Sequence, residues 1–185
     1  MSKTAVLALE AHLDALFHIF GCVVHQRPQW QFPGARLRSG SAVYVMFPNG
    51  APIRLSTGSA RHPLWMLVQE TVVLHQHFDH SWHTTLDNYT YQLFRGDGQS
   101  RFDEIVTYHW TPNDPGARRA WPHLHIGSTF IDPGARREPW SLHKTHFATG
   151  PMPPNAFVRM AVEEFGVQPV VADWQARITE PVGHP

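Results

Sequence analysis

The chain has 185 residues, which suffices for one folded domain with a substantial core and is short for two. Hydrophobic residues make up 42% of it and charged residues 16%, so the composition is that of a folded protein and excludes an intrinsically disordered one. Fifteen Lys and Arg residues balance fifteen Asp and Glu residues. The chain as a whole therefore lacks the basic surplus that marks many nucleic-acid-binding proteins.

Cysteine content and hydropathy restrict the cellular setting. Cys22 is the only cysteine, which excludes an intrachain disulfide and a cysteine-rich zinc site. No run of 18 apolar residues is present, and Glu10, His12 and Asp14 interrupt the apolar N-terminal stretch. We therefore expect neither a membrane span nor a signal peptide, and predict a cytoplasmic protein with no membrane partner.

The N-terminal half begins with a predicted helix over residues 4–20, where apolar residues recur at spacings of three and four before Gly21. The Pro-, Gly- and Arg-rich stretch HQRPQWQFPGARLRSGS predicts a loop. SAVYVMF predicts a strand, PNG a turn, and APIRLS the hairpin partner of that strand. PLWMLVQETVVLHQHF predicts a second helix that starts at Pro63, although its β-branched run also favours a strand.

The C-terminal half gives the clearest strand signals. YTYQLF and FDEIVTYHW flank the turn pair Asp97-Gly98 and predict an antiparallel hairpin, which WPHLHIG extends into a meander. PPNAFVRMAVEEFG predicts a helix, ADWQARI a short terminal helix, and residues 180–185 a mobile tail. We predict a single α+β domain over residues 1–185, with a central antiparallel β-meander flanked by N-terminal and C-terminal helices and a histidine-rich core at 89–166.

Strand alternation predicts which histidines share a surface. In PHLHI, Leu124 and Ile126 point to one face, while His123 and His125 point to the other. Their Cβ atoms are then about 7 Å apart, close enough for two imidazoles to converge on one ion or anion. The preceding strand brings His109 to the same face in one register, and a slip of one residue would remove it.

Three functional hypotheses fit this surface, besides a polar sheet face that meets only water. In the leading one, His123 and His125 act with His109, His143 or His146 as acid and base on a phosphodiester, such as RNA. In the second, His123 and His125 hold a zinc ion with His146, or else with His109, His143 or Asp132. In the third, the surface binds a protein or nucleic acid without chemistry.

Basic residues near these histidines suit a phosphate. In the leading hypothesis Arg118, Arg119, Lys144 and Thr145 bind the substrate. The sequence leaves open whether the protein is an enzyme, and it identifies neither a cofactor nor an oligomeric state.

Short motifs resemble two known families, and a third is excluded. Histidine-triad hydrolases carry His-X-His-X-His, and Gly127 occupies the third place here, which excludes that family. HTT at 83–85 and HKT at 143–145 resemble the paired motifs of 2H phosphoesterases, which implies that His83 and His143 are acid and base. YTYQLF, TYHW and WPHLHIG, within residues 89–127, resemble TumE-like toxins of bacterial toxin–antitoxin systems. That resemblance implies a nucleic-acid-directed role inside a bacterial cell.

Overall fold

The computed structural model describes residues 3–58, 63–96, 102–112, 121–127, 129–130, 140–141 and 146–179. Its elements, in chain order, are α1 (Lys3–Phe20), β1 (Gln29–Gln31), β2 (Ala42–Met46), a 3-10 turn η1 (Pro48–Gly50), β3 (Ile53–Arg54), β4 (Leu64–Gln76), β5 (Trp82–Gly96), β6 (Phe102–Trp110), β7 (His123–Ile126), β8 (Thr129–Phe130), β9 (Trp140–Ser141), β10 (His146–Ala148), α2 (Pro154–Glu163) and α3 (Trp174–Thr179).

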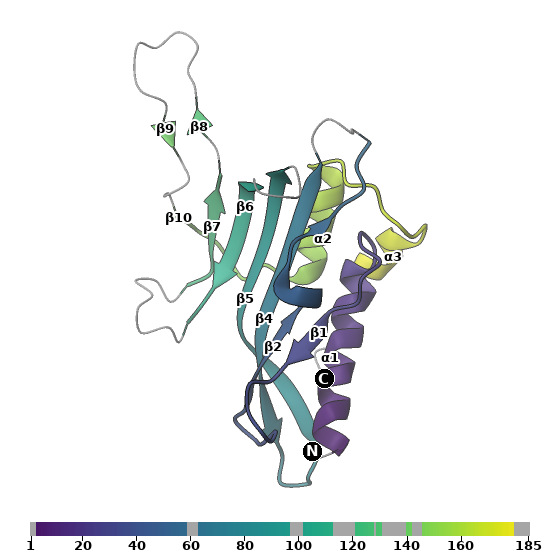
Figure 1. The fold of residues 1–185 in the computed structure, drawn as a ribbon, viewed down its shortest axis with the longest axis vertical. Coiled ribbons are helices and arrows are strands. Elements are labelled where there is room, and N and C mark those ends of the chain that lie inside the picture. The colour runs from purple at the N-terminus through teal and green to yellow at the C-terminus, as the bar shows by residue number, and fades with distance from the viewer. Residues whose placement is uncertain are drawn as a thin grey trace.

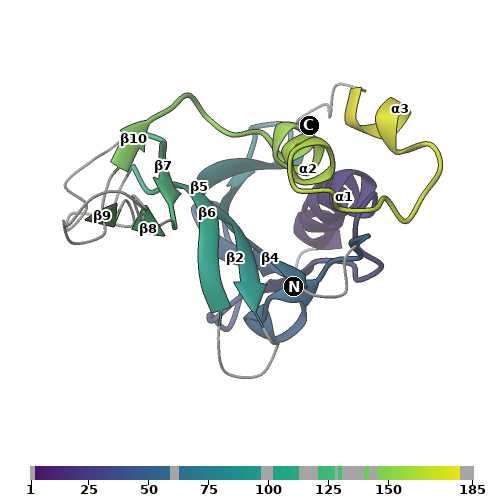
Figure 2. The ribbon, with the colours of Figure 1, turned by 90° about the horizontal axis from the view of Figure 1, so that it is seen from above.

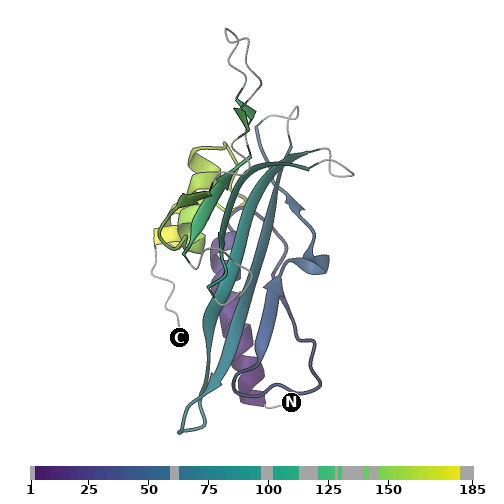
Figure 3. The ribbon, with the colours of Figure 1, turned by 90° about the vertical axis from the view of Figure 1, so that its left-hand side faces the viewer.

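The protein has an α+β fold in which an eight-stranded antiparallel sheet carries helices on one face (Figure 1). Seven strands follow the order β1-β2-β4-β5-β6-β7-β10, β3 also pairs with β4, and β8 and β9 form a separate pair. Figure 2 shows α1 and α2 together on the concave side of the curved sheet. Figure 3 shows α1 beside the lower part of the long central strands and α2 beside their upper part. The predicted fold class is confirmed.

The core lies between this concave face and the two helices. Tyr91, in the middle of β5, is fully buried and contacts the rings of Phe20 in α1 and Phe157 in α2, at centroid distances of 5.7 and 5.5 Å. α1 ends at Phe20, and the backbone nitrogen of Gly21 donates a hydrogen bond to the carbonyl of Phe17 at 2.8 Å. A Cβ on Gly21 would lie 2.4 Å from that carbonyl oxygen, so only glycine fits this helix end.

The predicted helix at residues 63–78 is wrong, because this segment forms the central strand β4. Alternate side chains from Leu64 to Leu74 are buried, including Met66, Val68 and Val72. This period of two is that of a strand with one face in the core, and the β-branched residues in its middle favour the extended backbone. Pro63 therefore precedes a strand and does not start a helix.

Two further predictions are corrected in the first third of the chain. The segment predicted as a loop contains β1, which pairs with β2. β3 does not pair with β2, because Ile53 and Arg54 stand opposite Met66 and Trp65 of β4. The predicted hairpin assumed that β2 and β3 pair with each other because they are consecutive along the chain. In the structure, both pair with the long strand β4.

The predicted hairpin, its third strand and the C-terminal helices agree with the sequence patterns, whereas the stretch 128–140, predicted as a loop, contains β8 and the first residue of β9. β5 and β6 form the predicted antiparallel hairpin, β7 extends it, and α2 and α3 lie where prolines and apolar spacing place them. The turn pair Asp97-Gly98 and the tail at 180–185 lie outside the described residues. None of the described helices combines the length and the apolar character that crossing a membrane requires.

Candidate metal centre

Three adjacent strands at one end of the sheet, β6, β7 and β10, bring four histidines together. His109 of β6 stands opposite His123 of β7, and His125 of β7 stands opposite His146 of β10. Directly paired residues in an antiparallel ladder have Cβ atoms about 4.5–5.5 Å apart, which is within side-chain reach. The two registers therefore gather four imidazoles in one patch, which we call the histidine cluster.

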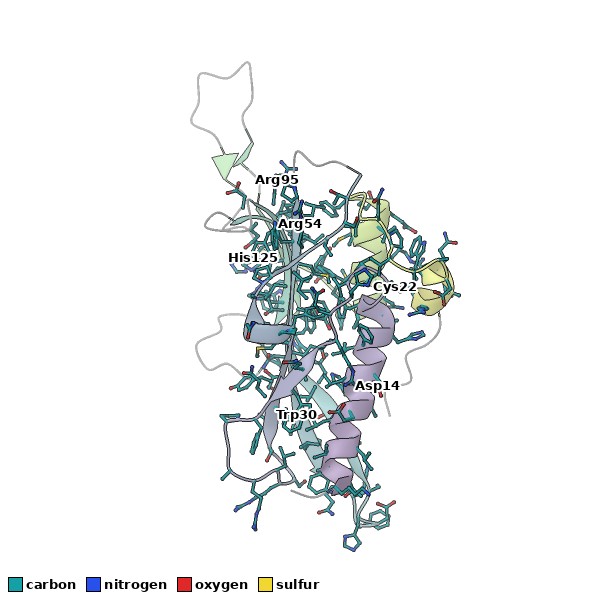
Figure 4. The ribbon with its side chains drawn as sticks, turned by 45° about the vertical axis from the view of Figure 1, so that its right-hand side comes forward. Asp14, Cys22, Trp30, Arg54, Arg95 and His125 are labelled. Atoms are coloured by element: carbon teal, nitrogen blue, oxygen red, sulfur yellow. The ribbon has the colours of Figure 1, made fainter. Side chains whose placement is uncertain are left out.

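The histidine cluster lies on the face of the sheet opposite to the helices. Leu124 of β7 pairs with Tyr108, whose ring contacts Phe157 of α2 at 6.3 Å, so these two side chains face the core. Because neighbouring side chains of a strand alternate, His123 and His125 face the other way. In Figure 4, His125 is on the side of the sheet away from α1. The alternation predicted from PHLHI is confirmed.

The ring nitrogens of the histidine cluster converge on a small volume. One nitrogen from each of the four rings lies within 4.8 Å of the others. Nε2 of His109 contacts Nε2 of His123 and lies 3.1 Å from Nε2 of His125. Two nitrogens bound to one tetrahedral zinc ion at 2.0–2.1 Å are about 3.3 Å apart. The spacing of His109 and His125 therefore suits two ligands of one metal ion.

The backbone determines which nitrogen of His123 faces the cluster. Nδ1 of His123 lies 2.9 Å from the carbonyl oxygen of Trp121. A carbonyl only accepts hydrogen bonds, so Nδ1 carries the proton, and in the neutral ring Nε2 keeps its lone pair. In metal-binding histidines, the ring nitrogen that does not bind the metal usually donates its N–H to such a group. This hydrogen bond orients the ring and makes the ligand nitrogen more basic.

Hydrogen bonding can account for only one of the two contacts that Nε2 of His109 makes, with His123 and with His125. His109 Nε2 approaches both neighbours, yet it carries at most one hydrogen, and one N–H can be directed well at only one acceptor. The other contact then opposes two lone pairs or two hydrogens. A cation at the centre accepts all the lone pairs together, so the arrangement favours a metal ion.

Burial, and next the neighbouring rings of His123, His125 and His146, lower the pKa of His109 from its ordinary 6.5 to about 4. Each effect disfavours the charged imidazolium. His109 is therefore neutral at pH 7, and its lone pair is available to a metal without competition from protons. A general acid that works near neutral pH, by contrast, needs a pKa close to that pH.

The donor set identifies the class of metal. Imidazole suits zinc, copper, iron and nickel, whereas calcium and magnesium prefer oxygen ligands. Among the described residues, no carboxylate joins the group of His109, His123, His125 and His146. Neutral ligands leave the full positive charge of a divalent ion uncompensated, and the site would therefore attract an anion.

The predicted site residues divide into two groups. His109, His123, His125 and His146 come together as described, including the register that the sequence left open for His109. The predicted residues outside the described part of the chain are His143, Lys144, Thr145, Arg118, Arg119 and Asp132.

His83 belongs to the motif HTT, which resembles the first motif of 2H phosphoesterases, and it lies away from the histidine cluster. The strand β5 pairs with β6 at Thr90, opposite His109, and His83 lies seven residues away, about 23 Å along an extended strand. Its ring stacks on those of His75 and His77, at centroid distances of 5.2 and 4.3 Å. His83 therefore takes no part in the histidine cluster.

A second polar group, on the opposite face of the sheet, was missed in the sequence. His12 Nε2 lies 2.7 Å from a carboxylate oxygen of Glu70, and the hydroxyl of Tyr91 donates to the other oxygen. All three residues are buried. Two signals were available: His12 lies among the apolar positions of α1, and Glu70 lies on the apolar face of β4.

Comparison with known proteins assigns no function to this site. No protein-family model, no curated protein and no solved structure matches the chain.

Proposed function

We propose that the protein is a metal-dependent hydrolase that binds zinc through the histidine cluster and acts on a phosphodiester. His109, His123 and His125 are the principal ligands, because their Nε2 atoms meet around one point. They belong to paired strands inside the sheet, which hold them rigidly. His146 comes from the short strand β10 at the end of the strand order, is partly exposed, and is the exchangeable fourth ligand.

The convergence of four ring nitrogens within 4.8 Å carries this proposal. On a polar sheet face that only meets water, nothing favours the convergence of three Nε2 atoms. In a metal site, the ligand nitrogens must converge on the ion. A catalytic zinc site uses three protein ligands and one open position, which matches three close histidines and one exposed one. Bound zinc supplies a Lewis acid and hydroxide at neutral pH.

The charge of the site and its neighbours along the chain favour a phosphate substrate. Neutral imidazoles leave the ion's charge for an anion to balance. Arg118 and Arg119 belong to the segment between β6 and β7, and Lys144 and Thr145 immediately precede β10. These are the residue types that bind phosphate oxygens. The resemblance to TumE-like toxins makes single-stranded RNA the first natural substrate to assay.

Metal binding is tested by elemental analysis of the purified protein and by zinc titration after treatment with a chelator. We expect one zinc ion per chain in the wild type and none in His123→Ala or His125→Ala. His77→Ala is the matched control, because it removes an exposed histidine outside the cluster and should keep the zinc. A wild-type protein that binds no transition metal would overturn the proposal.

His146→Ala separates a catalytic site from a structural one. If His146 is the exchangeable ligand, this variant keeps stoichiometric zinc at reduced affinity, whereas a closed four-histidine site loses the metal. The affinity change should be about 10- to 100-fold.

Activity is tested with bis(p-nitrophenyl) phosphate and with single-stranded RNA. We expect zinc-dependent cleavage that a chelator abolishes and that falls at least about 100-fold in His123→Ala. Cleavage that resists the chelator would instead support acid–base catalysis without metal. Zinc binding without cleavage of either substrate would indicate a structural or partner-binding site.

A further inference from the structure

The concave face of the sheet contains a second candidate site, independent of the proposed hydrolase centre. A cavity of about 360 Å³ lies between α1, the strands β4 to β6 and the segment that leads into α2. Trp110 lines this cavity, while the preceding residue, His109, belongs to the histidine cluster on the other face. One strand thus presents two sites to opposite sides of the sheet.

The walls of the cavity are mainly apolar and aromatic. Leu16 and Ile19 come from α1, and the rings of Tyr89 and Tyr91 stack at a centroid distance of 4.8 Å. An apolar cavity of about 150 Å³ holds one benzene molecule, so about 360 Å³ has room for two fused rings. Among the described residues that line it, none is Lys or Arg, so the cavity offers no permanent cation to a carboxylate or phosphate.

One polar pair at the wall gives the cavity a directional hydrogen-bonding group. Glu70 is 3% exposed and accepts hydrogen bonds from His12 Nε2 at 2.7 Å and from the Tyr91 hydroxyl. Both carboxylate oxygens of Glu70 are therefore already engaged by protein groups. Since Nε2–H of His12 is directed at Glu70, Nδ1 is the acceptor of the neutral ring, and a ligand that binds it must bring the hydrogen.

We propose that this cavity binds a small neutral bicyclic aromatic molecule that carries a hydroxyl group, and that the hydroxyl donates its hydrogen bond to Nδ1 of His12. The fused rings pack between Leu16, Ile19 and the stacked tyrosines. Glu70 positions the imidazole by holding Nε2–H, and Tyr91 holds Glu70. Anionic analogues are disfavoured because no Lys or Arg among the residues that line the cavity balances their charge.

The test uses 2-naphthol as the probe, with 2-methylnaphthalene as the isosteric control that lacks the hydroxyl and 2-naphthoate as the anionic control. Binding to the full chain is measured by calorimetry, and the site is located by NMR shifts of the Leu16 and Ile19 methyl groups. We expect 2-naphthol to bind about fivefold more tightly than 2-methylnaphthalene, from one hydrogen bond, and 2-naphthoate to bind most weakly. Equal affinity of 2-naphthol and 2-methylnaphthalene would overturn the role of His12.

Variants separate the cavity from the rest of the molecule. Ala15→Trp fills the cavity and should abolish binding, whereas His123→Ala on the other face should leave it unchanged. His12→Phe keeps a ring and should remove the preference for the hydroxyl. Since His12→Phe can also unfold the protein, circular dichroism is recorded for each variant. The comparison of the three probes on the wild-type protein does not depend on the His12→Phe variant. Binding that persists in folded Ala15→Trp, or the absence of any binding to the wild type, would overturn the proposal.

Discussion

His109 and His123 stand directly opposite each other in the β6–β7 ladder, and their Nε2 atoms are in contact. Nδ1–H of His123 donates a hydrogen bond to the Trp121 carbonyl, so in the neutral ring Nε2 meets His109 with its lone pair. This arrangement is compatible with a cation bound between the two rings.

The metal-free protein should lose stability in mild acid because of His109. The pKa of His109 falls to about 4 in the folded protein, from an ordinary 6.5 that the unfolded chain regains. Between these values the unfolded state binds more protons, so this contribution is complete above pH 6.5 and is lost as the pH falls towards 4. Urea unfolding of chelator-treated protein from pH 7.5 to 4 measures it. A smaller loss is expected in His109→Gln, and an identical loss would contradict the prediction.

Gly127→Ala should disturb the strand pairing that builds the histidine cluster. A Cβ at Gly127 would lie 1.8 Å from the backbone oxygen of Glu104, so β6 and β7 must separate at this point. We expect a loss of about 1–3 kcal/mol in the free energy of unfolding, together with weaker zinc binding. Gly150→Ala is the control, because nothing lies within 4 Å of its Cβ. Zinc affinity unchanged in Gly127→Ala would contradict the predicted coupling.

Tyr91→Phe should destabilise the protein through Glu70. The variant keeps the ring but removes one of the two donors to a buried carboxylate. The expected loss in the free energy of unfolding is about 1–3 kcal/mol. Tyr44→Phe, at a side chain 46% exposed, should change it by less than about 0.5 kcal/mol. Equal effects in the two variants would show that the buried hydroxyl contributes nothing to stability.

Phe157→Ala should weaken the attachment of α2 to the sheet. Phe157 is fully buried and contacts the rings of Tyr91 and Tyr108, so its removal leaves a cavity between helix and sheet. A loss of about 3–5 kcal/mol in the free energy of unfolding is expected by chemical denaturation. Phe78→Ala, at a residue 97% exposed, provides the comparison and should leave the unfolding midpoint in place. A similar midpoint for both variants would show that α2 does not depend on this ring.

The strands around the histidine cluster could be predicted because local alternation is strong there. PHLHI separates His123 and His125 from Leu124 and Ile126, and this division holds in the folded protein. The segment that forms β4 was predicted as a helix, because its spacings also fit one. Such spacings arise when a strand has one buried face and apolar residues on part of the other face. Its alternation from Leu64 to Leu74 was present in the sequence but was outweighed by Pro63.

By itself, the sequence determined the class of the fold, the two faces of β7 and the identity of the candidate ligands. Only the tertiary structure decided that His109 and His146 join His123 and His125, because strand register depends on pairing partners far along the chain. It also decided the meeting of His12 with Glu70, which lie 58 residues apart. Local pattern fixes the direction of a side chain along its own element, whereas only packing between elements fixes which side chains meet.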